Sequence, residues 1–305
     1  MDIRRSDAVP DGICLRIELQ IVAVNPDRTL PKALESGHML LVDGHVHLYD
    51  CFDPPLFLDS AYSNLRAAAQ ALGIHPDRWS GCLCFTETSR DFAFSRLAAA
   101  GTVGSWRVAR TGEPETLELF SGDRRLLIVA GHQIATAERL EVLAIGTCAR
   151  VPDHLSIRET LARVQDLSAL PIIPWAFGKW TASRGKVLRQ IIEQSTPVDF
   201  AVGDNAGRPG LSLYPPLLTL AKSRGHLFLS GSDPLPMPAQ AKRVGIAGFV
   251  VPDWQPGDSP AVRIKALLSS KPVHVRPFGA PNGLLRFVGM QVGMRLYSRM
   301  RRGAA

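Results

Sequence analysis

Two histidines separated by one residue close a short apolar stretch in the first fifth of the chain. His45 and His47 follow the run Leu40-Leu41-Val42, with Asp43 and Gly44 between. On an extended strand, side chains at positions i and i+2 point to the same side, about 7 Å apart. Neutral imidazole is the commonest metal ligand in proteins, and two imidazoles on one face provide half of a coordination shell. The pattern therefore predicts a metal site at the end of a strand.

Further polar side chains follow other apolar runs along the chain. They are Glu87, His132, Gln133, Trp175, Asp204, Asn205, Ser232 and Asp233. In parallel α/β barrels, functional side chains gather at the C-terminal ends of the strands. Their repeated placement predicts one site at one mouth of a barrel. Several of these residues also have a structural alternative. Glu87 and Asp233 could cap the helices that follow, His132 could be a hydrogen-bonded surface or core residue, and Asp204 and Asn205 could simply form a turn.

Cationic residues lie beside glycines in two later loops. Lys179 and Arg184 follow one predicted strand, and Arg208 follows the next. Cations beside glycines and a helix N-terminus form a pocket for an oxyanion or a phosphate. We therefore expect these three residues to bind an anionic substrate or ligand, with Trp175 and Asn205 lining the same pocket. Ordinary surface charge is the alternative for the cations, and a core position is the alternative for Trp175.

Apolar runs and helical patterns alternate over much of the chain. Helices are expected at about 61–72, 91–100, 156–167, 186–194, 215–224 and 259–269, and buried strands at 40–47, 80–88, 172–175, 199–202, 226–230 and 247–251. Between 105 and 143 the pattern changes to short strands and turns. Strands separated by such helices indicate βα units and a parallel sheet closed as a barrel. We expect an N-terminal strand extension at 1–37, a barrel at 38–270, and a basic C-terminal extension at 271–305 packed on the barrel.

The composition is that of a folded globular protein. Hydrophobic residues make up 46% of the 305 residues and charged residues 21%, which argues against disorder. The five cysteines are an odd number without a framework spacing, a pattern typical of a reducing compartment. No run approaches the roughly 20 apolar residues of a membrane span, and the N-terminus has no apolar signal region. These features predict a cytoplasmic protein.

The formal net charge of +7 is unevenly distributed. Much of the excess lies near the C-terminus, in Arg286, Arg295, Arg299, Arg301 and Arg302. A basic, partly apolar tail is a candidate for weak contact with an anionic membrane or a partner. Glycines within it disfavour an isolated helix, so packing against the barrel is the default expectation.

The order of these motifs resembles that of the PHP superfamily, the metal-dependent phosphoesterases of polymerase and histidinol phosphatase type. The segments that carry the resemblance are 42–47 for the D-x-H-x-H strand, 84–88 for T-D-H, 129–134 and 140–146 for the G-x-E strand and its successor, 173–176 for A-H-P, and 229–234 for G-S-D-A-H. The resemblance covers about residues 38 to 250. It implies a distorted (β/α)₇ TIM-like barrel that holds two or three metal ions.

Several positions depart from the pattern of that superfamily. Thr88, Leu143, Trp175 and Leu235 stand where the family carries histidines. The resemblance therefore implies a reduced site with one divalent ion, Zn²⁺ or Mn²⁺. Its expected ligands are His45, His47 and Asp233, with either Glu87 or His132 as the fourth, and with one position open to water.

The leading hypothesis is a PHP-like, metal-dependent hydrolase that acts as a phosphoesterase on a phosphate-bearing or other anionic small molecule. Either Glu87 or Asp233 would take the proton of the attacking water. Nucleic acid is not expected as a partner. Two alternatives remain open. One is a catalytically inactive PHP-like ligand-binding or scaffold protein, because so many histidines are missing. The other is an amidohydrolase-type hydrolase, which also pairs an opening H-x-H with a closing aspartate.

Overall fold

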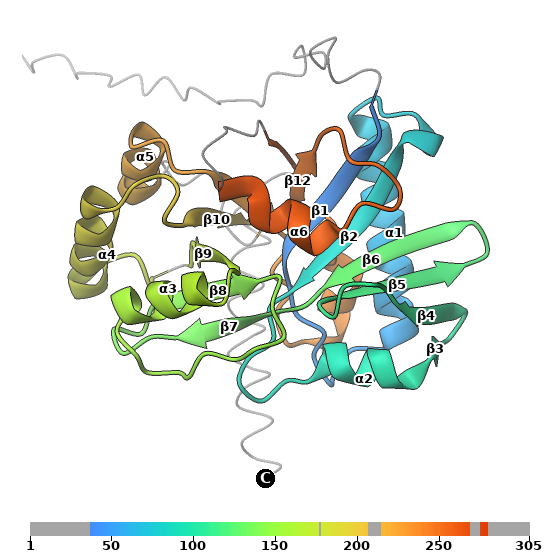
Figure 1. Cartoon of the computed structure of the whole chain (residues 1–305), viewed down its shortest axis with the longest axis horizontal. Helices are drawn as coiled ribbons and strands as arrows, with labels where there is room; N and C mark the ends of the chain where they lie inside the picture. Colours follow the sequence, from blue (N-terminus) through green and yellow to red (C-terminus); the bar gives the residue numbers. More distant parts are fainter. Residues whose placement is uncertain (1–36, 177, 207–214, 269–274, 280–305) are drawn as a thin grey trace, which may run out of the picture.

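The computed structural model describes residues 37–176, 178–206, 215–268 and 275–279 (Figure 1). The strands are β1 (Met39–Val46), β2 (Trp79–Phe85), β3 (Thr102–Val103), β4 (Trp106–Arg110), β5 (Thr116–Ser121), β6 (Arg124–Val129), β7 (Gly131–Ala135), β8 (Glu141–Ile145), β9 (Leu170–Pro174), β10 (Ala201–Asn205), β11 (Phe228–Gly231), β12 (Gly248–Val251) and β13 (Arg276–Phe278). The α-helices are α1 (Pro54–Ala71), α2 (Ala93–Ala100), α3 (Ile157–Asp166), α4 (Ala182–Gln194), α5 (Pro216–Ser223) and α6 (Pro260–Lys265). Short 3₁₀-helices are η2 (Pro76–Arg78), η3 (Pro238–Arg243) and η4 (Ala266–Leu268).

Local sequence accounts for where the main helices begin. The side chain of Asp53 accepts a hydrogen bond from the Leu56 N–H at 2.7 Å and caps α1. Ser156 caps α3 in the same way, by accepting from the Glu159 N–H at 3.2 Å. The pair Ser156 and Glu159 has the spacing of a capping box. Each cap satisfies an N–H group that the helix itself leaves unpaired.

The described strands form two sheets. The larger has the order β13-β12-β1-β2-β6-β5-β4-β3, and the smaller has the order β11-β10-β9-β8-β7. Strands β1, β2 and β6 run parallel, as do β9, β10 and β11. The remaining pairs, including the whole β3–β6 meander, are antiparallel. This meander is the turn-rich region of the sequence, and it widens one sheet instead of adding βα units.

Alternate residues of each buried strand enter different cores. In β1, Met39 and Leu41 pack towards α1, whereas Leu40 and Val42 face the other way. The strands β2 and β6 divide their side chains similarly, and Cys82 and Cys84 of β2 face the same interior as Leu40. This follows from the two-residue period of a strand, which buries an apolar run on both faces when both are covered.

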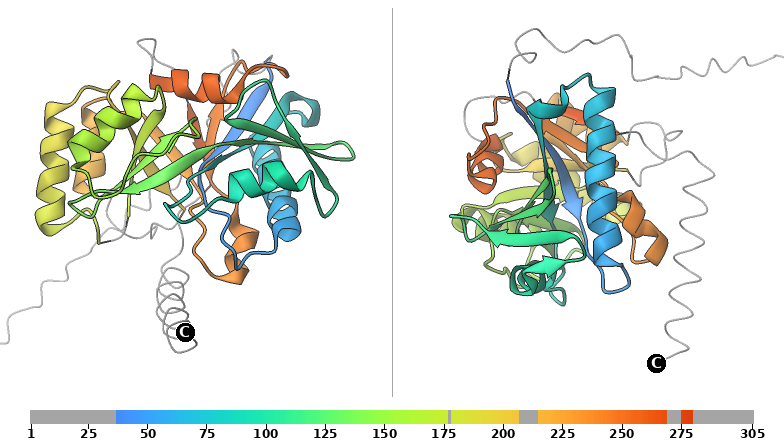
Figure 2. Two further views of the ribbon diagram at one scale, coloured as in Figure 1. Left: turned by 60° about the horizontal axis from the view of Figure 1, so that its bottom comes forward. Right: turned by 90° about the vertical axis from the view of Figure 1, so that its right-hand side faces the viewer.

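The interior core is shared by the two sheets. It takes side chains from β1, β2 and β6 of the larger sheet and from β8, β9, β10 and β11 of the smaller one. Helices α3, α4 and α5 cover the outer face of the smaller sheet, while α1 lies along the outer face of the larger one (Figures 1 and 2). The order of layers is therefore helices, sheet, shared core, sheet and helices.

The α/β prediction is confirmed, but the predicted closed (β/α)₇ TIM-like barrel is not. Among the described residues the strands form two separate hydrogen-bonded sheets. Single contacts join the sheets at their edges: the Asp233 N–H donates to the His45 carbonyl at 2.9 Å, and Glu87 and His132 form one isolated parallel bridge. Antiparallel strands occupy places where a barrel of βα units would have parallel ones.

Both predicted terminal extensions lie largely outside the described residues. Residues 1–36 lie outside the described part of the chain, and so do the arginines of the C-terminal tail. Within the predicted C-terminal extension, β13 pairs antiparallel with β12 and belongs to the larger sheet. In the described residues, no helix has both the length and the apolar character needed to cross a bilayer.

Candidate metal centre

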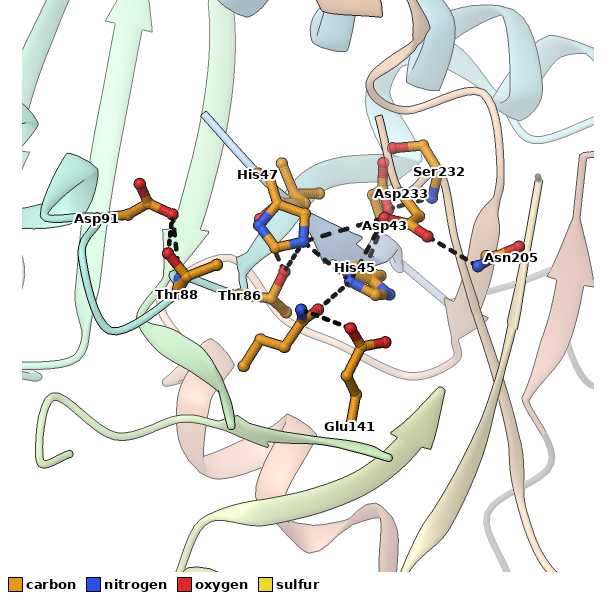
Figure 3. A network of polar contacts seen from close by, with 12 residues as sticks. Asp43, His45, His47, Thr86, Thr88, Asp91, Glu141, Asn205, Ser232 and Asp233 are labelled. Atoms are coloured by element: carbon orange, nitrogen blue, oxygen red, sulfur yellow. Dashed lines mark hydrogen bonds and ion pairs between the residues drawn. The ribbon is translucent and has the colours of Figure 1, made fainter. Parts of the chain in front are cut away.

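His45 and His47 lie at the C-terminal end of β1, and both are buried. The pairing of β1 with β2 is irregular between Asp43 and Val46, which is a bulge-like shift directly before the second histidine. Such irregularities redirect side chains next to functional sites. Here the two imidazoles converge, and their Nε2 atoms lie 3.1 Å apart (Figure 3).

Asp233 reaches the histidines from the loop after β11. A Cβ atom on Gly231 would lie 2.4 Å from the backbone nitrogen of His45, so only glycine lets β11 approach β1 this closely. Asp233 itself has a φ of +45°, a left-handed conformation that aspartate tolerates better than most residues. A non-glycine residue held in this conformation is typical of functional sites.

The three side chains form a compact set of possible ligands. His45, His47 and Asp233 each offer one ligand atom, and these atoms all lie within 4.8 Å of one another. The Asp233 Oδ1 atom lies 3.6 Å from Nε2 of His45 and 3.9 Å from Nε2 of His47. With the 3.1 Å between the two nitrogens, these sides define a triangle whose circumscribed radius is about 2.1 Å, the length of zinc–nitrogen and zinc–oxygen bonds in proteins. The spacing therefore fits one divalent ion.

A buried carboxylate beneath the site holds the two sheets in register. Asp43 is fully buried and accepts hydrogen bonds from the N–H groups of Ser232 at 2.8 Å, Gly245 at 2.7 Å and His45 at 3.3 Å. Burial raises the pKa of Asp43 to about 6, against the opposing effect of these donors. Asp43 thus joins the strand that carries His45 to the loop that carries Asp233.

Burial also sets the protonation of the cluster. It lowers the pKa of His47 well below the usual histidine value, and the neighbouring His45 lowers it further. Burial raises the pKa of Asp233, while His45 acts in the opposite direction. His47 is therefore neutral at pH 7, as a metal ligand must be. The ring of Tyr49, two residues later, stacks on His47 with centroids 5.0 Å apart.

Asn205 and Thr86 support the ligand atoms. The side-chain amide of Asn205, at the end of β10, donates to Oδ2 of Asp233 at 2.8 Å and to the Trp175 carbonyl at 2.9 Å. This leaves Oδ1 of Asp233 turned towards the imidazoles (Figure 3). The Thr86 hydroxyl lies 3.4 Å from Nε2 of His47 and donates to the Val46 carbonyl at 3.1 Å. Asn205, predicted to line the site, therefore lies against one of its ligands.

Gln133 belongs to the site, as its place at a strand end predicted, although the sequence patterns did not include it among the metal ligands. Its Oε1 atom lies 3.2 Å from Nε2 of His45. Its Nε2 atom donates to Glu141 at 3.1 Å, and Glu141 forms an ion pair with Lys179. Gln133 and His132 are neighbours in β7, so they point to opposite faces. The alternation of side chains along a strand could have predicted that only one of these two residues faces the histidines.

Glu87 and His132, each predicted as a fourth ligand, lie outside the cluster. Oε1 of Glu87 accepts from the Phe94 N–H at 2.6 Å, and Oε2 binds Arg150 at 2.7 Å. Nε2 of His132 accepts from the Val151 N–H at 3.0 Å. The atoms that would ligate a metal are therefore engaged in holding α2 and the loop after β8. Both residues take the structural alternatives that their types allowed.

The predicted anion-binding residues are dispersed. Lys179 contacts Glu141, and Arg184 donates to the Gly178 carbonyl at 2.8 Å. Arg208 lies outside the described residues. Trp175 is buried in the core between the smaller sheet and its helices. Among the described members of this group, Lys179 connects to His45 through two side chains, Glu141 and Gln133, and Asn205 contacts Asp233 directly.

No protein-family model and no curated protein sequence matches the chain. Among solved structures, PsfC from Pseudomonas syringae PB-5123 matches with a TM-score of 0.53 and 16% identity, over 86% of this chain and 99% of PsfC. The lesion-specific endonuclease PfuEndoQ from Pyrococcus furiosus matches with a TM-score of 0.48 and 12% identity, over 79% of this chain and 59% of that one. The match to PsfC shows a shared fold.

A third match is a two-domain protein from Bacteroides vulgatus ATCC 8482 that contains a predicted PHP-like metal-dependent phosphoesterase. Its TM-score is 0.39 with 11% identity, over 79% of this chain and 65% of that one.

One prediction about partners needs correction. A second structure of endonuclease Q, with a TM-score of 0.47 and 12% identity over 80% of this chain, holds a 27-mer duplex with an abasic lesion at the active site. The prediction that excluded nucleic acid as a partner is therefore wrong. The duplex is a substrate of endonuclease Q, and the substrate of the present chain is a separate question.

Proposed function

We propose that this chain is a metal-dependent hydrolase of PHP type, of the phosphoesterase kind, which uses one divalent ion held by His45, His47 and Asp233. The observation that carries the proposal is the triangle of their ligand atoms, whose sides of 3.1, 3.6 and 3.9 Å suit a single ion. Two imidazoles and a carboxylate are a donor set that suits Zn²⁺ and Mn²⁺. Such an ion activates water and offsets the negative charge of an ester undergoing attack.

The surrounding residues of the chain support this chemistry. Asn205 fixes Oδ2 of Asp233, so that Oδ1 keeps its direction towards the imidazoles. Asp233 lies beside both imidazoles, so its carboxylate would be next to the water that an ion held there activates. Glu87 lies outside the cluster, where a backbone N–H and a guanidinium bind its two oxygens. We therefore assign the role of general base to Asp233.

The proposed substrate is a phosphate-bearing or other anionic molecule. Support comes from the loop after β9, where Lys179 is a third exposed and lies one side chain away from Gln133 at the centre. Arg184, in the first turn of α4, is half-buried and donates to the carbonyl of Gly178 in that loop. Cations close to a metal centre stabilise the charge of a phosphoryl group during hydrolysis.

The test is hydrolysis of a panel of phosphomonoesters and phosphodiesters, with nucleotides and oligonucleotides included. Metal-stripped protein is assayed alone and with Zn²⁺ or Mn²⁺. We expect turnover of at least one substrate that depends on the added ion and is lost in the double variant His45→Ala/His47→Ala. His75→Ala, a change at an exposed histidine, serves as the matched control and should retain full activity. Turnover that survives the double substitution would contradict the proposal.

A second candidate is a ligand-binding protein without turnover. The observation that favours it is the small number of convergent ligands: among the described residues, one group of three is close enough to hold an ion. The same panel separates the two candidates. Tight binding of a phosphorylated ligand by metal-free protein, with no hydrolysis under any metal condition, supports the binding protein.

A further inference from the structure

We propose that Glu141, held by Lys179, is a positioning residue that directs the side-chain carbonyl of Gln133 at the metal centre, where it acts as a fourth and uncharged oxygen donor. The inference rests on the proposed metal site and adds to it a donor and the device that orients this donor. Gln133, Glu141 and Lys179 come from β7, β8 and the loop after β9, so three consecutive segments of the smaller sheet converge on the site.

Strand register places the glutamine and the glutamate on one face. Gln133 is paired with Leu143, and Ala135 with Glu141, in the antiparallel ladder of β7 and β8. Gln133 and Glu141 are therefore diagonal neighbours, since residues 141 and 143 share a face. Diagonal neighbours lie within reach of long side chains, and the amide of Gln133 contacts Glu141 at 3.1 Å. The same register directs Gln133 into the shared interior together with Leu143.

Hydrogen-bonding chemistry then fixes which end of the amide faces the histidines. An ionised carboxylate only accepts hydrogen bonds, so the NH₂ group of Gln133 must face Glu141. The ion pair with Lys179 holds Glu141 in place. The carbonyl oxygen is left to point the other way, 3.2 Å from Nε2 of His45. An oxygen atom thus lies beside the triangle of ligand atoms.

The arrangement has a consequence for charge. A carboxylate bound to the ion would add a negative charge to the site, whereas an amide oxygen adds a ligand without adding charge. Glu141 supplies its negative charge from one side chain farther away. Residues that orient metal ligands in this way typically change metal affinity by about 10–100-fold when they are replaced.

The experiment measures Co²⁺ binding to the metal-stripped full-length chain, by titration calorimetry and by the visible absorption spectrum of the bound ion. Gln133→Leu removes the donor at similar volume, and Glu141→Gln removes the group that orients it. We expect each to weaken Co²⁺ binding by about 10–100-fold and to alter the Co²⁺ spectrum. Gln70→Leu, on the exposed face of α1, is the matched control and should bind as the unmodified chain does.

The double exchange Gln133→Glu/Glu141→Gln provides a gain-of-affinity test. It keeps an amide-to-carboxylate hydrogen bond but places the charged partner next to the ion. We expect it to bind Co²⁺ more tightly than the unmodified chain, by about tenfold or more. A merely structural role for Gln133 would leave affinity and spectrum unchanged in a folded variant, which thermal unfolding verifies.

The outcomes separate this inference from the metal site itself. If His45→Ala/His47→Ala abolishes Co²⁺ binding while the Gln133 and Glu141 variants match the unmodified chain in affinity and spectrum, the positioning role is overturned and the three-ligand site stands. If the unmodified chain binds no Co²⁺, Zn²⁺ or Mn²⁺, both proposals are overturned.

Discussion

His132 shows how closely a structural and a functional residue can lie in this chain. It is adjacent to Gln133 but faces away from the metal centre, where its Nε2 accepts the N–H of Val151. Burial lowers the pKa of His132 to about 4, because a charged imidazole would lose its hydration, and Arg150 lowers it further. A neutral ring is also required by the hydrogen bond that it accepts.

His132→Gln tests this description through pH. Glutamine can accept the same hydrogen bond but does not titrate. The unfolded chain takes up a proton at histidine below about pH 6.5, whereas folded His132 resists protonation until about pH 4. The stability of the unmodified chain relative to the variant should therefore be full above pH 7 and should fall by up to about 1.4 kcal/mol per pH unit between 6.5 and 4. Urea denaturation at several pH values measures the difference, and a pH-independent difference would show that His132 titrates normally.

Glu87→Gln separates a structural carboxylate from a ligand. Phe92, the residue before α2, provides no side-chain cap, so Glu87 takes that role from outside by accepting the Phe94 N–H. Loss of its charge weakens the cap and the ion pair with Arg150, and we expect a destabilisation of about 1–2 kcal/mol. Metal affinity should not change. Urea denaturation measures the stability of the variant, and metal titration of the same sample measures its metal affinity. A large loss of metal affinity would show that Glu87 is a ligand.

At the scale of elements, the site depends on the contact between β1 and β11. Gly231 and Gly44 let the two backbones approach, since a Cβ on Gly44 would lie 2.9 Å from the Ser230 carbonyl oxygen. Asp43 of β1 also links the two elements, by accepting a hydrogen bond from the N–H of Ser232 after β11. The distance from Asp233 to the histidines is therefore set by the backbones as much as by side-chain rotamers.

Gly231→Ala should separate these strands. The added methyl group would meet the His45 backbone at 2.4 Å, which nothing but a backbone shift can relieve. We expect a loss of about 1–3 kcal/mol in stability, typical of overpacking, together with weaker metal binding because Asp233 moves from the imidazoles. Gly112→Ala is the control, because a Cβ there meets no atom within 4 Å. If Gly231→Ala binds metal normally, the close approach is not what positions Asp233.

The sequence allowed the strand ends to be predicted better than their mutual positions. His45, His47 and Asp233 stood out because a short apolar strand leads directly into each loop. Whether His132 or Gln133 meets the histidines depends on which face of β7 is turned towards them, and that face is set by pairing with β8, in which the partner of Gln133 is Leu143. The prediction of a closed barrel was wrong because β3 to β6 pair antiparallel, as hairpins, and widen the larger sheet. A run of apolar residues predicts a buried strand but does not specify its partner or the direction of pairing.

At the scale of the whole molecule, the two sheets enclose one apolar core and place their polar residues at one end of it. β1 contributes Leu40 and Val42 to that core and His45 to the site beyond it. The smaller sheet contributes Leu143 to the core and Gln133 to the site in the same manner. The shared core thus holds in place two edges that the described hydrogen-bond ladders do not join.

Metal stoichiometry tests the central claim most directly. The full-length chain is loaded with Zn²⁺ or Mn²⁺, freed of unbound ion by gel filtration, and analysed by elemental mass spectrometry beside His45→Ala/His47→Ala. The described geometry predicts one ion per chain in the unmodified protein and none in the double variant, with both proteins folded. Equal metal content in the two proteins, or no bound ion in either, would contradict the account.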